Sequence, residues 1–228
     1  FTFISLFGIS VTLAVLIVVA ALYDHAVSPQ GTEAELDRLL LLSRITMSGP
    51  QSRWYGAPGY GFVDRYTRDL PGVERMTIFE SPREGVGFIG TERVVLTLRH
   101  CDAEYWRVFH FRFLEGGPFS EVDDREGRRV AVINATTKRR FFGDGPALGK
   151  ALDVSAASYR VVGVVADVPA LRRMTSGEVY APFGAIRDPG YRRRLLGDCI
   201  AAFLTEGPHV REELRSAFAE RLTRVEFD

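Results

Sequence analysis

The stretch RRVAVINATTKRRFFGDGPALGKALDVSAASYRVVGVVADVP, residues 128–169, decides the fold class of this chain. Its apolar run VAVIN is typical of a buried strand, and Asn134 at the end of that run predicts a cap for a helix over residues 135–142. KALDV and YRVVGVVADVP then predict two more strands, the second of which ends at Pro169. Strands and helices that follow one another without strict alternation favour an α+β fold.

The turn inside this stretch, FFGDGPALGK (residues 141–150), invites comparison with a loop that cradles nucleotide phosphates. That loop has a Gly, four residues, then Gly-Lys and a Ser or Thr. Gly149 and Lys150 fit, but Asp144 stands where the first glycine belongs, and Ala151 offers no hydroxyl for a magnesium ion. The sequence therefore argues against nucleotide binding and predicts a turn between a helix and a strand.

The segments around this stretch continue the mixture of strands and helices. Residues 62–80 predict a short helix, a stop at Pro71 and Gly72, and a strand that begins at Val73. We expect three further strands at residues 93–100, 178–183 and 199–205.

Residues 32–61 predict a helix followed by a loop. Thr32 and Glu35 have the spacing of a capping box, and the leucines after them favour a helix to about residue 47. The segment SGPQSRWYGAPGYG (residues 48–61) is rich in Gly and Pro and predicts a loop.

Two segments predict packing faces in the second half of the chain. Residues 102–119 open with Asp102 as a cap, and we expect their aromatic side chains to anchor a core rather than to form a ligand cage. Residues 208–222 predict a helix with Pro208 in its first turn. The apolar residues of that helix recur every four positions and form one stripe, which consists of Val210, Leu214, Phe218 and Leu222.

The beginning of the chain, FTFISLFGISVTLAVLIVVAALY (residues 1–23), contains no charged side chain. A helix of this length measures about 34 Å at about 1.5 Å per residue, which is enough to cross a hydrocarbon core of about 30 Å. A secretory signal peptide has a shorter apolar region of about 7–15 residues, a basic start and a small-residue cleavage site. A helix buried in a soluble protein is rarely apolar on every face. We therefore predict a transmembrane helix over residues 1–23.

The charges after this run predict the side of the membrane. Acidic residues follow from Asp24 onward, and the first Lys or Arg is Arg38. Cytoplasmic flanks of membrane helices are usually rich in Lys and Arg. We therefore expect residues 24–228 to form a domain outside the cytoplasm.

The composition excludes one class of partner. The 228 residues balance 29 Lys and Arg against 29 Asp and Glu, so the formal net charge is +0. Nucleic-acid-binding domains usually carry a basic excess. We therefore predict no nucleic-acid partner.

Reactive and metal-binding residues show no catalytic pattern. The four histidines are scattered, and no two of them have the spacing of zinc ligands; they are His25, His100, His110 and His209. His100 precedes Cys101, but neighbouring residues of a strand point to opposite faces, so the imidazole is poorly placed to activate the thiol. Cys101 and Cys199 form either a disulfide or two buried thiols, and their apolar surroundings favour thiols. We predict no catalytic, cofactor-binding or metal-binding residue.

The order of these motifs resembles the MacB-like periplasmic core domain, found in ABC transporter permeases of the MacB/FtsX class. The resemblance rests on FRFLEGGPFS, VAVIN, FFGDGPALGK and YRVVGVVADVP, with LPGVERMT before them and EVYAPF after them. Together with the apolar run at the start, it covers nearly the whole chain. Each motif alone is weak, whereas their order and spacing are specific.

The resemblance implies a fold and a function. The fold is a first membrane helix, a two-lobed α+β domain outside the cytoplasm and at least three more membrane helices, so we expect this chain to be a segment of a longer inner-membrane permease. The implied partners are a cytoplasmic ABC ATPase, a second permease copy and the membrane, with an outer partner protein in some members. The implied function is export, including efflux of drugs, lipoprotein extraction or mechanotransmission, without catalysis by this domain.

Two other functions stay open from the sequence. A single-pass, membrane-anchored sensor or binding module fits the same apolar run and outer domain. A membrane-anchored hydrolase is the other alternative, and activity on generic ester or peptide substrates would reveal it.

Overall fold

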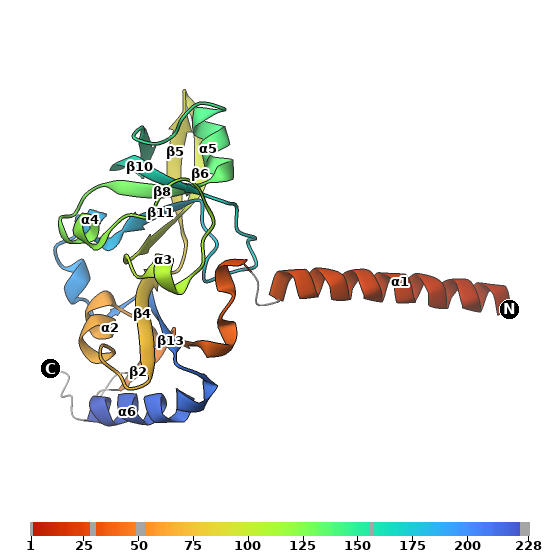
Figure 1. Ribbon diagram of the computed structural model, residues 1–228, viewed down its shortest axis with the longest axis horizontal. Helices are drawn as coiled ribbons and strands as arrows, with labels where there is room; N and C mark the ends of the chain where they lie inside the picture. Colours follow the sequence, from red (N-terminus) through yellow and green to blue (C-terminus); the bar gives the residue numbers. More distant parts are fainter. Residues whose placement is uncertain (1, 28–30, 49–52, 156, 224–228) are drawn as a thin grey trace.

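The computed structural model describes residues 2–27, 31–48, 53–155 and 157–223. One helix, α1 (Thr2–Val27), extends away from a body in which strands and short helices are mixed (Figure 1). The body has two lobes that share one ten-stranded sheet. The predicted α+β class is confirmed.

Six strands of this sheet form a closed ring, which we call the barrel lobe. The pairings run from β5 to β6, β11, β8, β10 and β9, and one pair between Gly87 and Val154 closes the ring back to β5. β7 (Phe113–Gly116) pairs with β10 outside the ring. The bounds of the ring strands are β5 (Arg83–Ile89), β6 (Glu92–Cys101), β8 (Val130–Asn134), β9 (Ala151–Val154), β10 (Ala157–Val165) and β11 (Val179–Pro182).

The other lobe, which we call the sheet lobe, continues from the end of β6. β4 (Val73–Glu80) meets β6 at the pair of Phe79 and Cys101, and β13 (Cys199–Thr205) and β1 (Leu39–Leu42) follow in antiparallel order. Helices α2 (Tyr60–Tyr66) and α6 (Arg211–Thr223) lie in this lower half (Figure 1). β6 is therefore the strand that the two lobes share.

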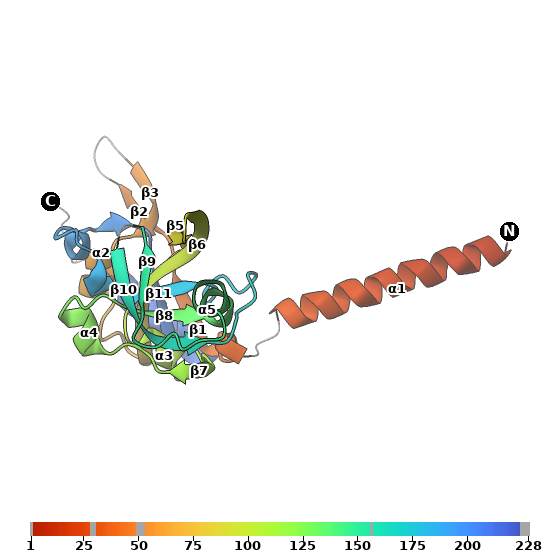
Figure 2. The same ribbon diagram turned by 90° about the horizontal axis from the view of Figure 1, so that it is seen from above.

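A small second sheet stands out from the body (Figure 2). It consists of β2 (Ile45–Ser48), β3 (Arg53–Pro58) and β12 (Leu196–Gly197), which are paired antiparallel. The remaining short elements are α3 (Tyr105–Val108), α4 (Glu121–Arg125), α5 (Ala135–Phe142) and the 3-10 turns at Gly31–Glu33, Leu36–Arg38, Phe183–Ala185, Tyr191–Arg193 and Pro208–Val210.

Three buried clusters form the core. One fills the barrel with aliphatic side chains such as Leu96, Ile133 and Val161. A second lies between the sheet lobe and its two helices, where Leu214 is buried and Phe218 and Leu222 are partly buried. The third contains the aromatic side chains of residues 105–119, among them Tyr105 and Trp106. The predicted aromatic anchors and the predicted stripe of α6 are thus confirmed.

The described side chains of α1 run from Leu6 to Leu22, and all of them are exposed. Within the residues that the structure describes, no helix is long and apolar enough to cross a membrane.

The predicted helix over residues 32–47 is wrong. Leu39–Leu42 form β1, which pairs with Leu204 to Ala201 of β13, and Ile45–Ser48 form β2. The hydroxyl of Thr32 lies 3.0 Å from that of Thr175 instead of capping a helix. The open edge of β13 offers hydrogen-bond partners and an apolar surface, and these long-range contacts outweigh the helix propensity of the leucines.

The predicted loop over residues 48–61 is also wrong in part, because β3 occupies Arg53–Pro58. Gly56 has no Cβ, and a Cβ there would lie 2.6 Å from the ring of Trp54, so the glycine makes room for the indole rather than ending the strand.

Candidate functional site

The segment that follows α1 is fixed to the barrel lobe by buried polar contacts. Glu33 accepts a hydrogen bond from the hydroxyl of Thr175 at 2.8 Å, and its carboxylate lies 3.7 Å from the guanidinium of Arg172. Glu33 and Arg172 are each 7% exposed. These contacts join the turn Gly31–Glu33 to the loop over residues 172–175 of the barrel lobe.

A second set of contacts fixes the next residues to the sheet lobe. Arg38 forms ion pairs with Glu35 and with Glu74 of β4, and its Nε donates to the carbonyl of Thr205 at 2.9 Å. The hydroxyl of Thr205 donates back to the carbonyl of Arg38 at 2.7 Å. The imidazole of His110 lies 3.0 Å from Glu35. The segment between α1 and β1 therefore contacts both lobes.

The C-terminal helix is held at the same place. β13 ends at Thr205 beside β1, and α6 begins at Arg211, after Glu206, Gly207 and the 3-10 turn Pro208–Val210. The hydroxyl of Thr205 also lies 3.1 Å from the carbonyl of Gly207. The guanidinium of Arg211 donates to the carbonyl of Asp37 at 2.5 Å. The segment that follows α1 and the turn before α6 therefore lie side by side, and we call this region, residues 31–38 with 205–211, the junction.

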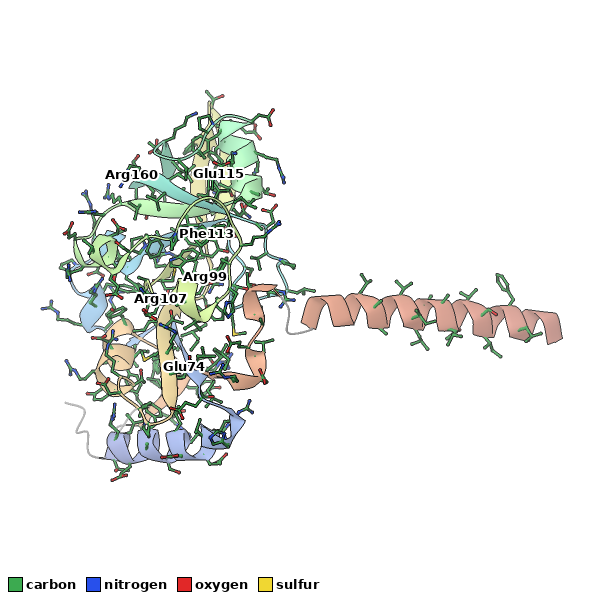
Figure 3. The ribbon with its side chains drawn as sticks, viewed as in Figure 1. Glu74, Arg99, Arg107, Phe113, Glu115 and Arg160 are labelled. Carbon is green, nitrogen blue, oxygen red and sulfur yellow. The ribbon has the colours of Figure 1, made fainter. Side chains whose placement is uncertain are left out.

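A buried arginine connects β6, the strand that both lobes share, to the loop over residues 172–177, which contacts the junction. Arg99 of β6 is fully buried, and Figure 3 shows it between Phe113 above and Glu74 below. It donates to the carbonyls of Glu80 at 2.8 Å, Arg173 at 2.8 Å and Ser176 at 2.9 Å. Its guanidinium also lies 5.3 Å from the ring centre of Phe79. Arg99 thereby fixes the loop over residues 172–177 against the shared strand.

A buried polar network lies where the two lobes meet. Glu80 at the end of β4 is fully buried, accepts a hydrogen bond from the hydroxyl of Tyr191 and lies 2.9 Å from Nδ1 of His100. Arg83 also lies 2.9 Å from this Nδ1. Because a guanidinium only donates, Nδ1 either accepts from Arg83 or carries a proton that it donates to Glu80, and the two bonds are alternatives.

The network keeps Glu80 charged in spite of its burial. Burial acts to raise the pKa of Glu80, but the hydrogen bond and charge of His100 and the bond from Tyr191 outweigh it, and the net shift of the pKa is downward. Burial raises the pKa of Tyr191, so this side chain stays a neutral donor. An ionised, fully paired carboxylate in this position holds the ends of β4 and β6 together.

Asp102 lies next to this network, at the end of β6. Its carboxylate accepts hydrogen bonds from the hydroxyl of Thr77 at 2.6 Å and from the backbone N–H groups of Ile78 and Tyr105 at 2.9 and 3.1 Å. Asp102 was predicted to cap a helix, but the N-cap of the four-residue helix α3 is Glu104, and the bond from Tyr105 reaches Asp102 two residues before that cap. Burial raises the pKa of Asp102 to about 7, against the opposing effect of these hydrogen bonds.

The two cysteines are not disposed as nucleophiles. Both are free and fully buried. Burial raises the pKa of Cys101 well above its ordinary value, and it raises the pKa of Cys199 to about 12. Since the thiolate is the reactive form, neither side chain is nucleophilic at neutral pH. The described residues also contain no group of three or more potential metal ligands.

The glycine-rich turn lies at the wrong end of its helix for a phosphate loop. Asn134 caps the N-terminus of α5, as predicted, by accepting from the N–H of Thr137 at 2.8 Å. The turn follows the C-terminus of α5 and leads into β9, and Gly149 in it has φ +78. Anions bind at helix N-termini, whereas the carbonyls at a C-terminus repel them. The predicted turn between a helix and a strand is confirmed.

Sequence reasoning missed the junction. Glu33, Arg38 and Arg172 are far apart in the chain, and their pairing depends on β1 lying beside β13. One signal was available in the sequence. The run of four leucines at residues 39–42 fits a strand as well as a helix, and residues 199–205 form a second apolar run with which such a strand could pair.

Comparison with known proteins finds one matching family model. Residues 2–212 match the MacB-like periplasmic core domain. Over 109 residues, 48% of this chain, the sequence is 30% identical to the macrolide export ATP-binding/permease protein MacB of Chromobacterium violaceum. The match spans only 15% of that relative's length.

Two solved structures share the fold. The periplasmic region of MacB from Actinobacillus actinomycetemcomitans superposes with a TM-score of 0.61 at 17% identity, covering 83% of this chain and 84% of that chain. A domain of a putative permease protein from Porphyromonas gingivalis superposes with a TM-score of 0.65 at 16% identity, covering 87% of this chain and 85% of that chain.

Proposed function

Because this chain belongs to the MacB-like periplasmic core domain family, we propose that it is the extracytoplasmic domain of an ABC transporter permease that couples cytoplasmic ATP hydrolysis to export or mechanotransmission. The observation that carries this proposal is the junction. There the segment after α1 and the turn before α6 are bonded to each other and to both lobes. A force on α1 is thereby delivered to the barrel lobe through Glu33 and to the sheet lobe through Arg38.

We place the domain at the inner membrane with residues 24–228 in the periplasm. Residues 1–23 carry no charge, and α1 exposes every side chain that the structure describes from Leu6 to Leu22. No Lys or Arg follows this run before Arg38, which favours an outer location for the flank. In this proposal residues 1–23 cross the membrane, and further membrane helices belong to the complete permease.

The coupling is mechanical. Movement of the membrane helix reaches Glu33 first, passes through Arg172 and Thr175 into the barrel loop, and reaches β6 through Arg99. Because β6 is shared by both lobes, they move together. Packed cores transmit displacement because they have few voids and low compressibility.

The proposed partners follow from the family. ATP is bound by a cytoplasmic ATPase subunit or domain, a second permease copy or homologous half completes a dimer, and an outer protein is engaged in some members. The domain itself requires no catalytic residue, cofactor or metal. Its buried thiols and the orientation of its glycine-rich turn accord with that assignment.

The proposal is tested with the complete gene product expressed together with its neighbouring genes. We expect an ABC ATPase to co-purify, and Glu33→Gln to reduce transport-stimulated ATP hydrolysis without releasing the ATPase. Glu92→Gln, on the exposed hairpin between β5 and β6, removes the same charge and serves as the matched control. If no ATPase accompanies the protein, the transporter assignment is wrong and an anchored binding module becomes the better assignment.

A further inference from the structure

A cleft of about 860 Å³ lies between the small outer sheet and the body. Its lining includes Arg44 and residues Tyr55 to Ala57 of β3, together with Ala170, Arg173, Met174 and Ser176 of the loop between β10 and β11. Leu41 of β1 and Ile200 of β13 also line it. Figure 2 shows the outer sheet, with β2 and β3, standing away from the body on this side.

The cleft is positively charged. Arg44 and Arg173 line it, and its lining contains no Asp or Glu. Among the described residues, Arg44 donates to the hydroxyl of Tyr55 at 3.1 Å, and no carboxylate is ion-paired with either arginine. Ser43, Ser81 and Ser176 add hydroxyl groups. Two arginines without acidic partners favour an anionic ligand.

The same cleft offers apolar contact. Leu41 is 46% exposed and Tyr55 is 64% exposed, although both lie on regular strands. Met174, Pro82 and Ile200 extend this surface. Exposed apolar side chains that gather in a concave surface mark binding sites more often than side chains that are scattered singly.

The cleft shares a loop with the contacts of Glu33. The loop that forms its wall also holds Thr175, which bonds Glu33, and the carbonyl of Arg173 accepts from the buried Arg99. A ligand between Arg44 and Arg173 would therefore contact the loop through which, in the proposed function, α1 moves the body.

We propose that this cleft binds an amphiphile with a single anionic head group, held by Arg44 and Arg173, whose apolar body lies on Leu41, Tyr55 and Ile200. The ligand is either a soluble amphiphile or a membrane lipid that carries the same head group. The inference goes beyond the proposed function, because binding does not require that the domain be coupled to an ATPase.

The test uses the full 228-residue chain in nanodiscs of phosphatidylcholine, titrated with octyl phosphate by calorimetry against empty nanodiscs. Octanol lacks the anion and inorganic phosphate lacks the apolar body, and we expect each to bind at least about tenfold more weakly, a difference of about 1.4 kcal/mol. If phosphatidylglycerol placed in the nanodisc competes with octyl phosphate, the ligand is a membrane lipid. If it does not compete, the ligand is a soluble amphiphile.

The variants decide whether the cleft is the site. Arg44→Gln/Arg173→Gln is expected to weaken octyl phosphate binding at least about tenfold. Arg93→Gln/Arg187→Gln removes two exposed arginines outside the cleft and should leave binding unchanged. Equal binding to both double variants, equal binding of octanol, or no binding above empty nanodiscs would each overturn the proposal. If no ATPase co-purifies with the complete gene product, the proposed function fails, but the result of this binding experiment is unaffected.

Discussion

Arg99→Met tests the role of the buried arginine in holding the two lobes and the junction loop together. The substitution removes hydrogen bonds to the carbonyls of Glu80, Arg173 and Ser176, and it also removes the guanidinium from the ring of Phe79. Hydrogen bonds to charged groups contribute about 1.5–3 kcal/mol each, and removing one side of a buried charged arrangement costs about 3–5 kcal/mol. Relief from desolvating the guanidinium offsets part of this loss. We expect a net loss of about 3 kcal/mol in the free energy of unfolding.

The assay is urea unfolding of the full chain, with Arg107→Met as the matched control. Arg107 has a side chain that is 58% exposed and pairs at the surface with Glu104, so its replacement should cost less than about 1 kcal/mol. Hydrogen exchange should also accelerate in residues 172–177 of Arg99→Met, because their carbonyls lose their donor. If Arg99→Met costs no more than the control and exchange in this loop is unchanged, Arg99 does not hold the loop.

Three further predictions concern other parts of the body. Burial raises the pKa of Asp102 from 3.8 to about 7, so the folded state binds more protons than the unfolded state between these pH values. The free energy of unfolding of the wild type should therefore fall as the pH rises from about 4 to 7 and level off above pH 7. Over the same range the free energy of unfolding of Asp102→Asn should rise by up to about 4 kcal/mol relative to that of the wild type, and parallel pH profiles would contradict this. Leu214→Ala, at a site 5% exposed, should lower the free energy of unfolding by about 2–4 kcal/mol and Glu213→Ala by less than about 0.5 kcal/mol, as measured by urea melts. Cys101 and Cys199 should react with a thiol reagent only on unfolding, and a fall in melting temperature on adding reductant would show instead that they are bonded to each other.

Local signals in the sequence predicted several elements of the barrel lobe, among them β8, α5 and β10. The apolar run VAVIN predicts a buried strand, and all five residues of β8 are indeed buried. The cap at Asn134 and the turn at Gly149 depend only on nearby residues. The closing pair of the ring, Gly87 with Val154, joins segments far apart in the chain. No local pattern indicates such a pair, so the barrel could not be predicted as a barrel.

The junction could not be predicted for a related reason. The run Leu39–Leu42 suits a helix or a strand equally, and only the free edge of β13 selects the strand. Once β1 is paired, Arg38 and Thr205 become neighbours and form reciprocal bonds. Glu33 and Arg172 likewise become neighbours only once the segment after α1 lies against the loop over residues 172–177.

The central claim, that ATP hydrolysis moves this domain as a coupled unit, is tested most directly by a distance between two copies. A spin label at Arg93→Cys, an exposed position on the barrel lobe, reports on the complete permease reconstituted with its ATPase, and the two native thiols are buried. The account predicts two different inter-copy distance distributions, one without nucleotide and one with ATP trapped. A single unchanged distribution in both states, or no second copy within range, would contradict it.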